Sequence, residues 1–225
     1  MHHQHHEMAA SLQDCAAAKA QARALRAIWL SRGIDLGHSA CLELVALRHG
    51  ARDWNTLSAQ LVGGRIVQPV PGAARLVHDR IFGLSGTEPE NIADRIFRMV
   101  HGASHLGTDM WGRRAYGLLA PLVSRLVELR SEGIRLDLQS IRNGLAMRAS
   151  RDGRSGYLDL SYSEGSPATP AQNEMRSYLI TIPGFPAAWA PNSRLQPKTR
   201  EYFGWLSMAF SKPLGQIVDE DAEAP

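Results

Sequence analysis

The amino-acid sequence predicts an all-α fold, made of a small three-helix N-terminal unit and a larger helical domain with long loops. Three observations favour this fold class: apolar residues recur at helical spacing, capping residues precede these stretches, and glycine or proline follows them. The one strand-like alternation stands at residues 157–162, inside a Gly-, Ser- and Asp-rich segment. A short hairpin there is the alternative to a simple loop.

Chain length and a segment rich in glycine and proline predict two folded units. The chain has 225 residues, which slightly favours two domains over one. We expect a linker at 63–74, because its prolines and glycines interrupt helical and strand periodicity alike. The helical domains would then be residues 11–62 and 75–217. A flexible histidine-containing tail, residues 1–10, precedes them, and an acidic disordered tail, residues 218–225, follows them.

Three short helices are predicted in the first domain. The first runs from Ser11 to Arg32, is rich in Ala, Leu and Arg, and ends at Gly33. Ser39 is the expected N-cap of the second, which reaches about His49. Asp53 is the expected N-cap of the third. Helices this short must pack on one another to be stable.

The first two helices of the second domain have clear boundary residues. Thr87-Glu-Pro-Glu90 is a capping-box pattern, and the helix that it opens ends at Gly102. Asp109 is the expected cap of the longest helix, from Met110 to about Ser131, with a kink at Pro121.

Three further helices are predicted after it. Asp137 would cap one that runs to about Ala149, and Thr169 to Gln172 would open one that runs to about Ile182. The last would run from about Pro197 to Ser211, where Pro213 breaks it.

Composition limits the protein class. There are 25 Lys and Arg against 22 Asp and Glu, a formal net charge of +3 and a sequence pI of about 9.1. Nearly all the basic residues are arginines. This composition excludes an acidic solvating chain, a collagen-like chain and a disulfide-dense one, and it permits nucleic-acid contact without demanding it.

Cysteine usage and hydropathy predict a cytoplasmic protein. Cys15 and Cys41 both fall in helical stretches, so we expect buried free thiols rather than a disulfide. No apolar run approaches the roughly 20 residues that span a bilayer, so no membrane insertion is predicted. The N-terminus also lacks the apolar core of a signal peptide.

Catalytic and metal-binding motifs are missing from the sequence. It contains no P-loop, no Gly-x-Gly-x-x-Gly and no Gly-x-Ser-x-Gly. His101, His105 and Asp109 could bind a metal only on a continuous helix, and the intervening glycines favour an interhelical loop. His38 and Ser39 beside Cys41 are interpreted as a helix start with a buried thiol. We therefore predict no enzyme activity, no cofactor and no metal, including at the N-terminal histidines.

Arginines supply the candidate binding site. The guanidinium group binds phosphate through a planar fork, so clustered arginines could contact a nucleic-acid backbone. The alternative is that they are solvated helix faces, paired in part with Glu43, Glu128, Glu132 and Asp137. Residues 39–61 also have a helix–turn–helix outline. The candidate nucleic-acid-binding residues are Arg48, Arg52, Arg113, Arg114, Arg148 and Arg151.

The N-terminal sequence resembles a known small domain. The resemblance rests on Leu25 to Ser39, Cys41-Leu-Glu-Leu-Val-Ala46, and Gly50 to Ala59 with its Asp-Trp-Asn-Thr-Leu element. These stretches are similar to the helical glyoxalase-related domain, which accompanies some glyoxalase-superfamily proteins and occurs in proteins of mobile elements. The resemblance does not imply glyoxalase activity, because the metal-binding βαβββ modules have no counterpart here.

Residues 84–217 resemble the all-α domain of type IV coupling proteins, the ATPases of conjugation and secretion. The resemblance implies a cytoplasmic module that receives DNA, relaxosome or adaptor cargo, with Trp111, Tyr178, Phe185 and Trp205 as packing residues. Nucleotide-binding motifs and the membrane segment are missing, so neither ATPase activity nor membrane anchoring follows. The resemblance rests on five sequence elements that follow the same order as in that domain: Leu84–Thr87; Met110–Ala115; Leu126–Arg130 with Leu136–Leu138; Ser177–Leu179 with Ile182–Phe185; and Tyr202–Met208 with Lys212–Leu214.

These observations predict a non-enzymatic, cytoplasmic accessory protein of conjugative DNA transfer or type IV secretion, encoded on a plasmid or other mobile element. It would bind DNA, a relaxosome protein or the coupling ATPase through its larger helical domain, with Arg113 and Arg114 as the first contacts. The alternative is a helix–turn–helix DNA-binding regulator that uses residues 39–61, and a remoter one is a glyoxalase-like metalloenzyme. The sequence leaves the oligomeric state open.

Overall fold

The fold is all-α, as the sequence predicts. In the computed structural model the described residues are 11–32, 34–101, 110–147, 156–163, 165–186 and 194–222. Over these ranges the chain is mostly helical and contains no sheet. It divides into two compact units, Met1–Ser85 with Ile217–Pro225, and Gly86–Gln216, and each is described by itself.

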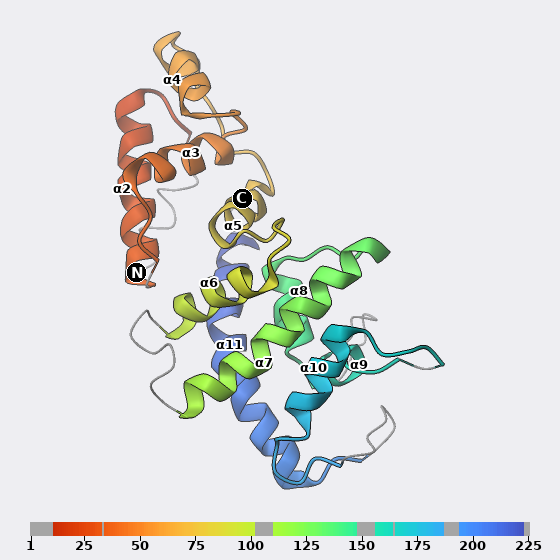
Figure 1. The fold of residues 1–225 in the computed structure, drawn as a ribbon. Helices are drawn as coiled ribbons and strands as arrows, with labels where there is room; N and C mark the ends of the chain where they lie inside the picture. The colour runs from red at the N-terminus through yellow and green to blue at the C-terminus, as the bar shows by residue number, and fades with distance from the viewer. Residues whose placement is uncertain are drawn as a thin grey trace. The chain divides into compact units, whose positions relative to one another are not determined.

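Over residues 11–85, as far as the structure describes them, the helices of the first unit are α2 (Cys15–Ser31), α3 (His38–Arg48), α4 (Trp54–Val62) and α5 (Ala73–Phe82) (Figure 1). Helix α3 packs against each of the other three, and α2 also contacts α4. The core between them consists of side chains with less than 5 % exposure, among them Ala18, Ala22, Leu25, Trp29, Cys41, Leu44, Val45, Leu57 and Phe82.

The helix starts of this unit depend on short polar side chains. The carboxylate of Asp53 accepts a hydrogen bond from the Thr56 backbone N–H at 2.8 Å, which confirms it as the N-cap of α4. Helix α2 begins at Cys15, later than the predicted Ser11, because Asp14 caps it. The predicted stop at Gly33 lies outside the described residues.

The predicted N-cap of α3 was wrong. The Cys41 N–H donates to the Gly37 carbonyl at 3.1 Å, so the first turn closes two residues before the expected cap. Gly37 is therefore the N-cap, and Ser39 lies inside the first turn. No side chain caps this helix.

The Gly/Pro segment 63–74 is attached to the first unit. Leu12 and Val67 exchange two backbone hydrogen bonds, at 2.8 and 3.0 Å, in an isolated bridge. The Val70 N–H donates to the Arg48 carbonyl at 2.9 Å. Gly50 has φ +73°, and a Cβ there would lie 2.7 Å from a Val70 methyl group, so this approach needs glycine. The division between the units accordingly follows α5, at Ser85 and Gly86, rather than the expected linker.

The second unit is arranged around α7 (Met110–Glu128). Helices α6 (Pro89–His101), α8 (Leu138–Gly144), α9 (Tyr157–Leu160) and α10 (Pro170–Leu179) all contact it. A 3₁₀ turn, η2 (Leu129–Glu132), continues α7 and ends at Gly133 with φ +84°. The central apolar side chains of α7 are fully buried: Leu118, Leu119, Leu122 and Val123. The helix continues through Pro121, and the kink there stays a prediction.

Two predicted caps of this unit are confirmed. Asp137 and Ser140 form a capping box at the start of α8, and Thr169 and Gln172 form one at the start of α10. The predicted cap of α7, Asp109, and the predicted end of α6, Gly102, lie outside the described residues.

The segment after α8 differs from the prediction. Helix α8 ends at Gly144 rather than near Ala149. Residues 157–160 form the single helical turn α9 instead of a hairpin strand. The reason is tertiary: the ring of Tyr157 is fully buried and packs edge-on against Phe203 at 5.5 Å, which an isolated two-stranded hairpin could not provide.

The last helix, α11 (Pro197–Ala222), is longer than predicted. It passes through Pro213, and at 26 residues it exceeds α7, so the expected break was wrong. Phe210 and Leu214, on either side of the proline, are fully buried, and this packing offsets the hydrogen bond that proline removes. Residues 218–222 are consequently helical rather than part of a disordered tail, while 223–225 lie outside the described residues.

Neither cysteine forms a disulfide: the Cys41 thiol is buried, as predicted, whereas Cys15 is partly exposed. Burial raises the pKa of the Cys41 thiol. Of the helices in the described part of the chain, none is long and apolar enough to cross a membrane.

Candidate functional site

Two of the six candidate arginines lie around the turn between α3 and α4. Arg48 is the last residue of α3 and is half-buried. Arg52 is almost fully exposed, and its Nε donates to a carboxylate oxygen of Asp53 at 2.9 Å. Of the two, Arg52 is the more available to a ligand, because an exposed ion pair is weak and exchanges readily.

The start of α4 is negatively charged, which bears on the helix–turn–helix interpretation. Hydrogen bonds from Thr56 and Arg52 hold the pKa of the Asp53 carboxyl at about 2. The Glu43 carboxylate accepts from the Trp54 N–H at 3.0 Å. Two carboxylates thus occupy the N–H groups that would otherwise favour a phosphate at this helix end. The two helices and the turn of a helix–turn–helix motif are present as α3 and α4. In such a motif the N-terminal end of the second helix contacts DNA, and here the carboxylates at that end of α4 disfavour a phosphate.

Arg113 and Arg114 lie in the first turn of α7, in the second unit. Arg113 is exposed. Arg114 is half-buried, and its guanidinium group lies 5.5 Å from the centre of the Tyr202 ring. The Arg114 carbonyl also accepts a hydrogen bond from the Tyr178 hydroxyl at 2.7 Å. Arg114 therefore contributes to packing between α7, α10 and α11, whereas Arg113 faces solvent.

The six candidate arginines are divided between the two units and residues outside the described ranges. Arg48 and Arg52 belong to the first unit, and Arg113 and Arg114 to the second. Arg148 and Arg151 lie outside the described residues. As a binding site, this set stays a prediction.

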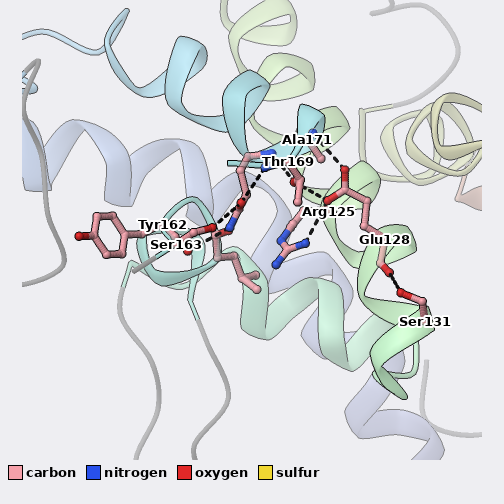
Figure 2. Close-up of polar contacts among 9 residues, drawn as sticks. Arg125, Glu128, Ser131, Tyr162, Ser163, Thr169 and Ala171 are labelled. Carbon is pink, nitrogen blue, oxygen red and sulfur yellow. Dashed lines mark hydrogen bonds and ion pairs between the residues drawn. The ribbon is translucent and has the colours of Figure 1, made fainter. Parts of the chain in front are cut away.

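Other arginines and acids have internal roles. Arg125, on α7, donates through Nη1 to Glu128 at 3.0 Å. The same carboxylate accepts from the Thr169 hydroxyl at 2.6 Å and from the Ala171 N–H at 3.2 Å (Figure 2). Glu128 therefore joins the end of α7 to the first turn of α10, where a negative charge is favourable.

The side chain of Gln172 organises the loop that precedes α10. Its Oε1 accepts from the Ser163 hydroxyl at 2.7 Å and from the Thr169 N–H at 3.0 Å. Its Nε2 donates to the carbonyls of Leu160 and Tyr162, at 3.2 and 3.0 Å. With 1 % exposure, this amide is a satisfied internal connection, and we assign it a structural role.

An exposed apolar pair on α11 was not predicted. Trp205 is 67 % exposed and Met208 is 68 % exposed, three residues apart on the same side of the helix. The expectation that Trp205 is a packing residue was therefore wrong. Among the described side chains of α11, the buried large apolar ones are Phe203, Leu206, Phe210 and Leu214.

The other three aromatic residues expected to pack have different outcomes. The ring of Tyr178 packs closely on Gly117, where a Cβ would lie 3.0 Å from it, which confirms the prediction. Phe185 is half-buried. The side chain of Trp111 lies outside the described part of the structure.

Two buried histidines of the first unit were also missed. Nε2 of His49 lies 3.2 Å from Oε1 of Gln21, and burial lowers the pKa of His49. His78 lies beside the rings of Trp29 and Phe82, and burial lowers its pKa to about 4. Both are therefore neutral at pH 7. His49 is the C-cap of α3, and His78 lies within α5.

The structure describes only one of the three residues considered as metal ligands, His101. His101 packs against the rings of Phe97 and Phe210, at 4.6 and 5.3 Å, while His105 and Asp109 lie outside the described residues. Within the described ranges, no three His, Cys, Asp or Glu side chains are grouped so that they could hold a metal ion.

Comparison with known proteins bears on the first unit. No curated protein matches the chain, and no solved structure matches it. Residues 8–78 match a protein-family model described as "Glyoxalase superfamily protein". This range contains α2, α3 and α4 and reaches into α5. The match supports a glyoxalase-related domain at the N-terminal end of the chain.

Proposed function

We propose that the protein is a non-enzymatic, cytoplasmic accessory protein of conjugative DNA transfer or type IV secretion. Its second unit would bind a protein of the relaxosome or the coupling ATPase, and Arg113 would add a contact to DNA or to an acidic partner. The order of five motifs in residues 84–217, similar to the all-α domain of type IV coupling proteins, supports this proposal. The glyoxalase-related first domain is consistent with a mobile-element protein.

The exposed pair on α11 is the observation that carries the proposal. Within the segment Tyr202–Met208, Phe203 and Leu206 are buried, whereas Trp205 and Met208 face outward. Tryptophan and methionine are enriched in protein interfaces, and tryptophan is among the commonest hot-spot residues. A protein partner seated on this side of α11 would remove the largest exposed aromatic side chain of the described residues from water.

A transfer assay tests the proposal. Deletion of the gene from donor cells should lower the transfer or secretion frequency, and the wild-type gene should restore it. Trp205→Ala with Met208→Ala should fail to restore it, because loss of a hot-spot pair costs about 2–4 kcal/mol, or roughly 30-fold or more in affinity. Ile180→Ala, at another exposed apolar position of the same unit, is the matched control. An unaffected frequency in the deletion strain would refute the proposal.

Purified full-length protein separates this function from the two alternatives. A regulator would select an operator from random duplexes, whereas an accessory protein would show no sequence preference. A metalloenzyme would purify with a stoichiometric divalent ion. Direct DNA binding through Arg113 predicts a salt-dependent affinity that Arg113→Gln weakens, and an affinity independent of salt would contradict it.

A further inference from the structure

The exposed side of α2 carries a row of three basic side chains. Lys19, Arg23 and Arg26 are exposed, and the helix sequence CAAAKAQARALRAIWLS contains no acidic residue. At about 100° per residue, the three lie within roughly 60° of one another around the helix axis. At about 1.5 Å per residue, the row spans roughly 10 Å along the axis. We call these three residues the α2 row.

Within the part of the chain that the structure describes, the one ion pair of the α2 row is exposed to solvent. Arg26 donates to Asp35 at 3.3 Å, and both side chains are about half or more exposed, at 46 % and 68 %. Such a pair contributes little and is readily exchanged for another anion. Asp35 therefore competes with any bound anion for the guanidinium group of Arg26.

The remaining exposed positions of α2 indicate which polyanion fits. Ala16, Ala20 and Ala27 are exposed and small, so a ligand backbone can approach the helix closely. Leu30, with 54 % exposure, is the single large apolar side chain on the exposed part of α2, too little to insert into a bilayer. Trp29 is buried, so no aromatic ring of α2 is available to stack on unpaired bases. These properties favour the phosphates of a duplex.

We propose that α2 binds the phosphate backbone of double-stranded DNA through Lys19, Arg23 and Arg26. The surrounding charge supports it, since residues 11–85 contain nine Lys and Arg against five Asp and Glu. The site lies in the first unit and does not depend on the partner proposed for α11. Its contacts are to phosphate and carry no base specificity.

Fluorescence anisotropy of a labelled 25-base-pair duplex tests the α2 row in the full-length protein. In the triple variant Lys19→Gln, Arg23→Gln, Arg26→Gln, the slope of log K against log salt, which is negative, should become less negative by about 2 to 3. The matched control is Arg65→Gln, Arg75→Gln, Arg80→Gln, which removes the same charge from exposed positions of the same unit. An equal loss in the control, or an unchanged slope in the α2 variant, would overturn the proposal.

Two further measurements sharpen the test. Asp35→Asn should tighten duplex binding several-fold at low salt, because it releases Arg26, whereas Asp79→Asn, with the same charge change, should have a smaller effect. An equal gain in duplex affinity in both variants would show that Asp35 does not compete with DNA for Arg26. The unpaired strand and vesicles of anionic phospholipid are the other probes. Binding that depends on the α2 row and is tighter to either than to the duplex would overturn the assignment to double-stranded DNA.

Discussion

The neutral state of His78 makes the first unit sensitive to acid. Its pKa is about 4 in the folded protein and 6.5 in the unfolded chain, because burial opposes the charged form and Arg32 and Arg48 add to the effect. The free energy of unfolding is therefore unaffected by His78 above pH 6.5, and it falls as the pH drops from 6.5 to about 4 and the folded state resists protonation of this ring. The total loss is about 3 kcal/mol. His78→Phe should remove this part of the pH dependence, and denaturation midpoints at pH 7 and pH 4.5 would show it. Identical pH profiles of variant and wild type would contradict the assignment.

Glu128 connects the end of α7 to the start of α10 through Thr169 and Ala171. Its replacement by alanine leaves Arg125, with only 12 % side-chain exposure, and the N–H of Ala171 without this acceptor. We expect Glu128→Ala to lower the free energy of unfolding by about 2–4 kcal/mol. Glu132→Ala, an exposed acid four residues later, should change it by less than about 0.5 kcal/mol. Comparable losses in both variants, measured by chemical denaturation, would count against this role.

Local sequence determined three of the helix starts, whereas the starts of α2 and α3 and the ends of α8 and α11 differ from the prediction. The caps at Asp53, Asp137 and Thr169 were predictable, because a capping side chain bonds to a backbone group only three residues away. The turn at 157–160 and the passage of α11 through Pro213 were not, because burial against distant residues decides them. The exposure of Trp205 was missed for the same reason. The spacing of residues shows which side chains share one side of a helix, and it does not show whether another element covers that side.

The close approach of α7 and α8 requires glycine. A Cβ at Gly144 would lie 2.7 Å from a methyl carbon of Leu122, which is fully buried. We expect Gly144→Ala to destabilise the second unit by about 1–3 kcal/mol through overpacking. Gly204, inside α11, has open space around its Cβ position, so Gly204→Ala should stabilise by about 0.5–1 kcal/mol. Thermal unfolding of the two variants should shift in opposite directions, and a shift in the same direction would contradict the packing.

At the scale of the whole molecule, the net charge of +3 conceals an uneven distribution. Four acidic residues lie near the C-terminus: Asp219, Glu220, Asp221 and Glu223. Replacing them with the corresponding amides raises the formal net charge from +3 to +7 without altering any basic residue. Because like charges repel, these carboxylates should slow the approach of a polyanion, with a range set by the ionic strength.

The four-amide variant should therefore associate with duplex DNA several-fold faster than the wild type at about 10 mM salt, where the Debye length is about 30 Å. At about 1 M salt, where the length is about 3 Å, the difference should disappear. Stopped-flow anisotropy at both salt concentrations measures this. A difference that persists at high salt would show that the acidic residues act by direct contact instead of through the overall field.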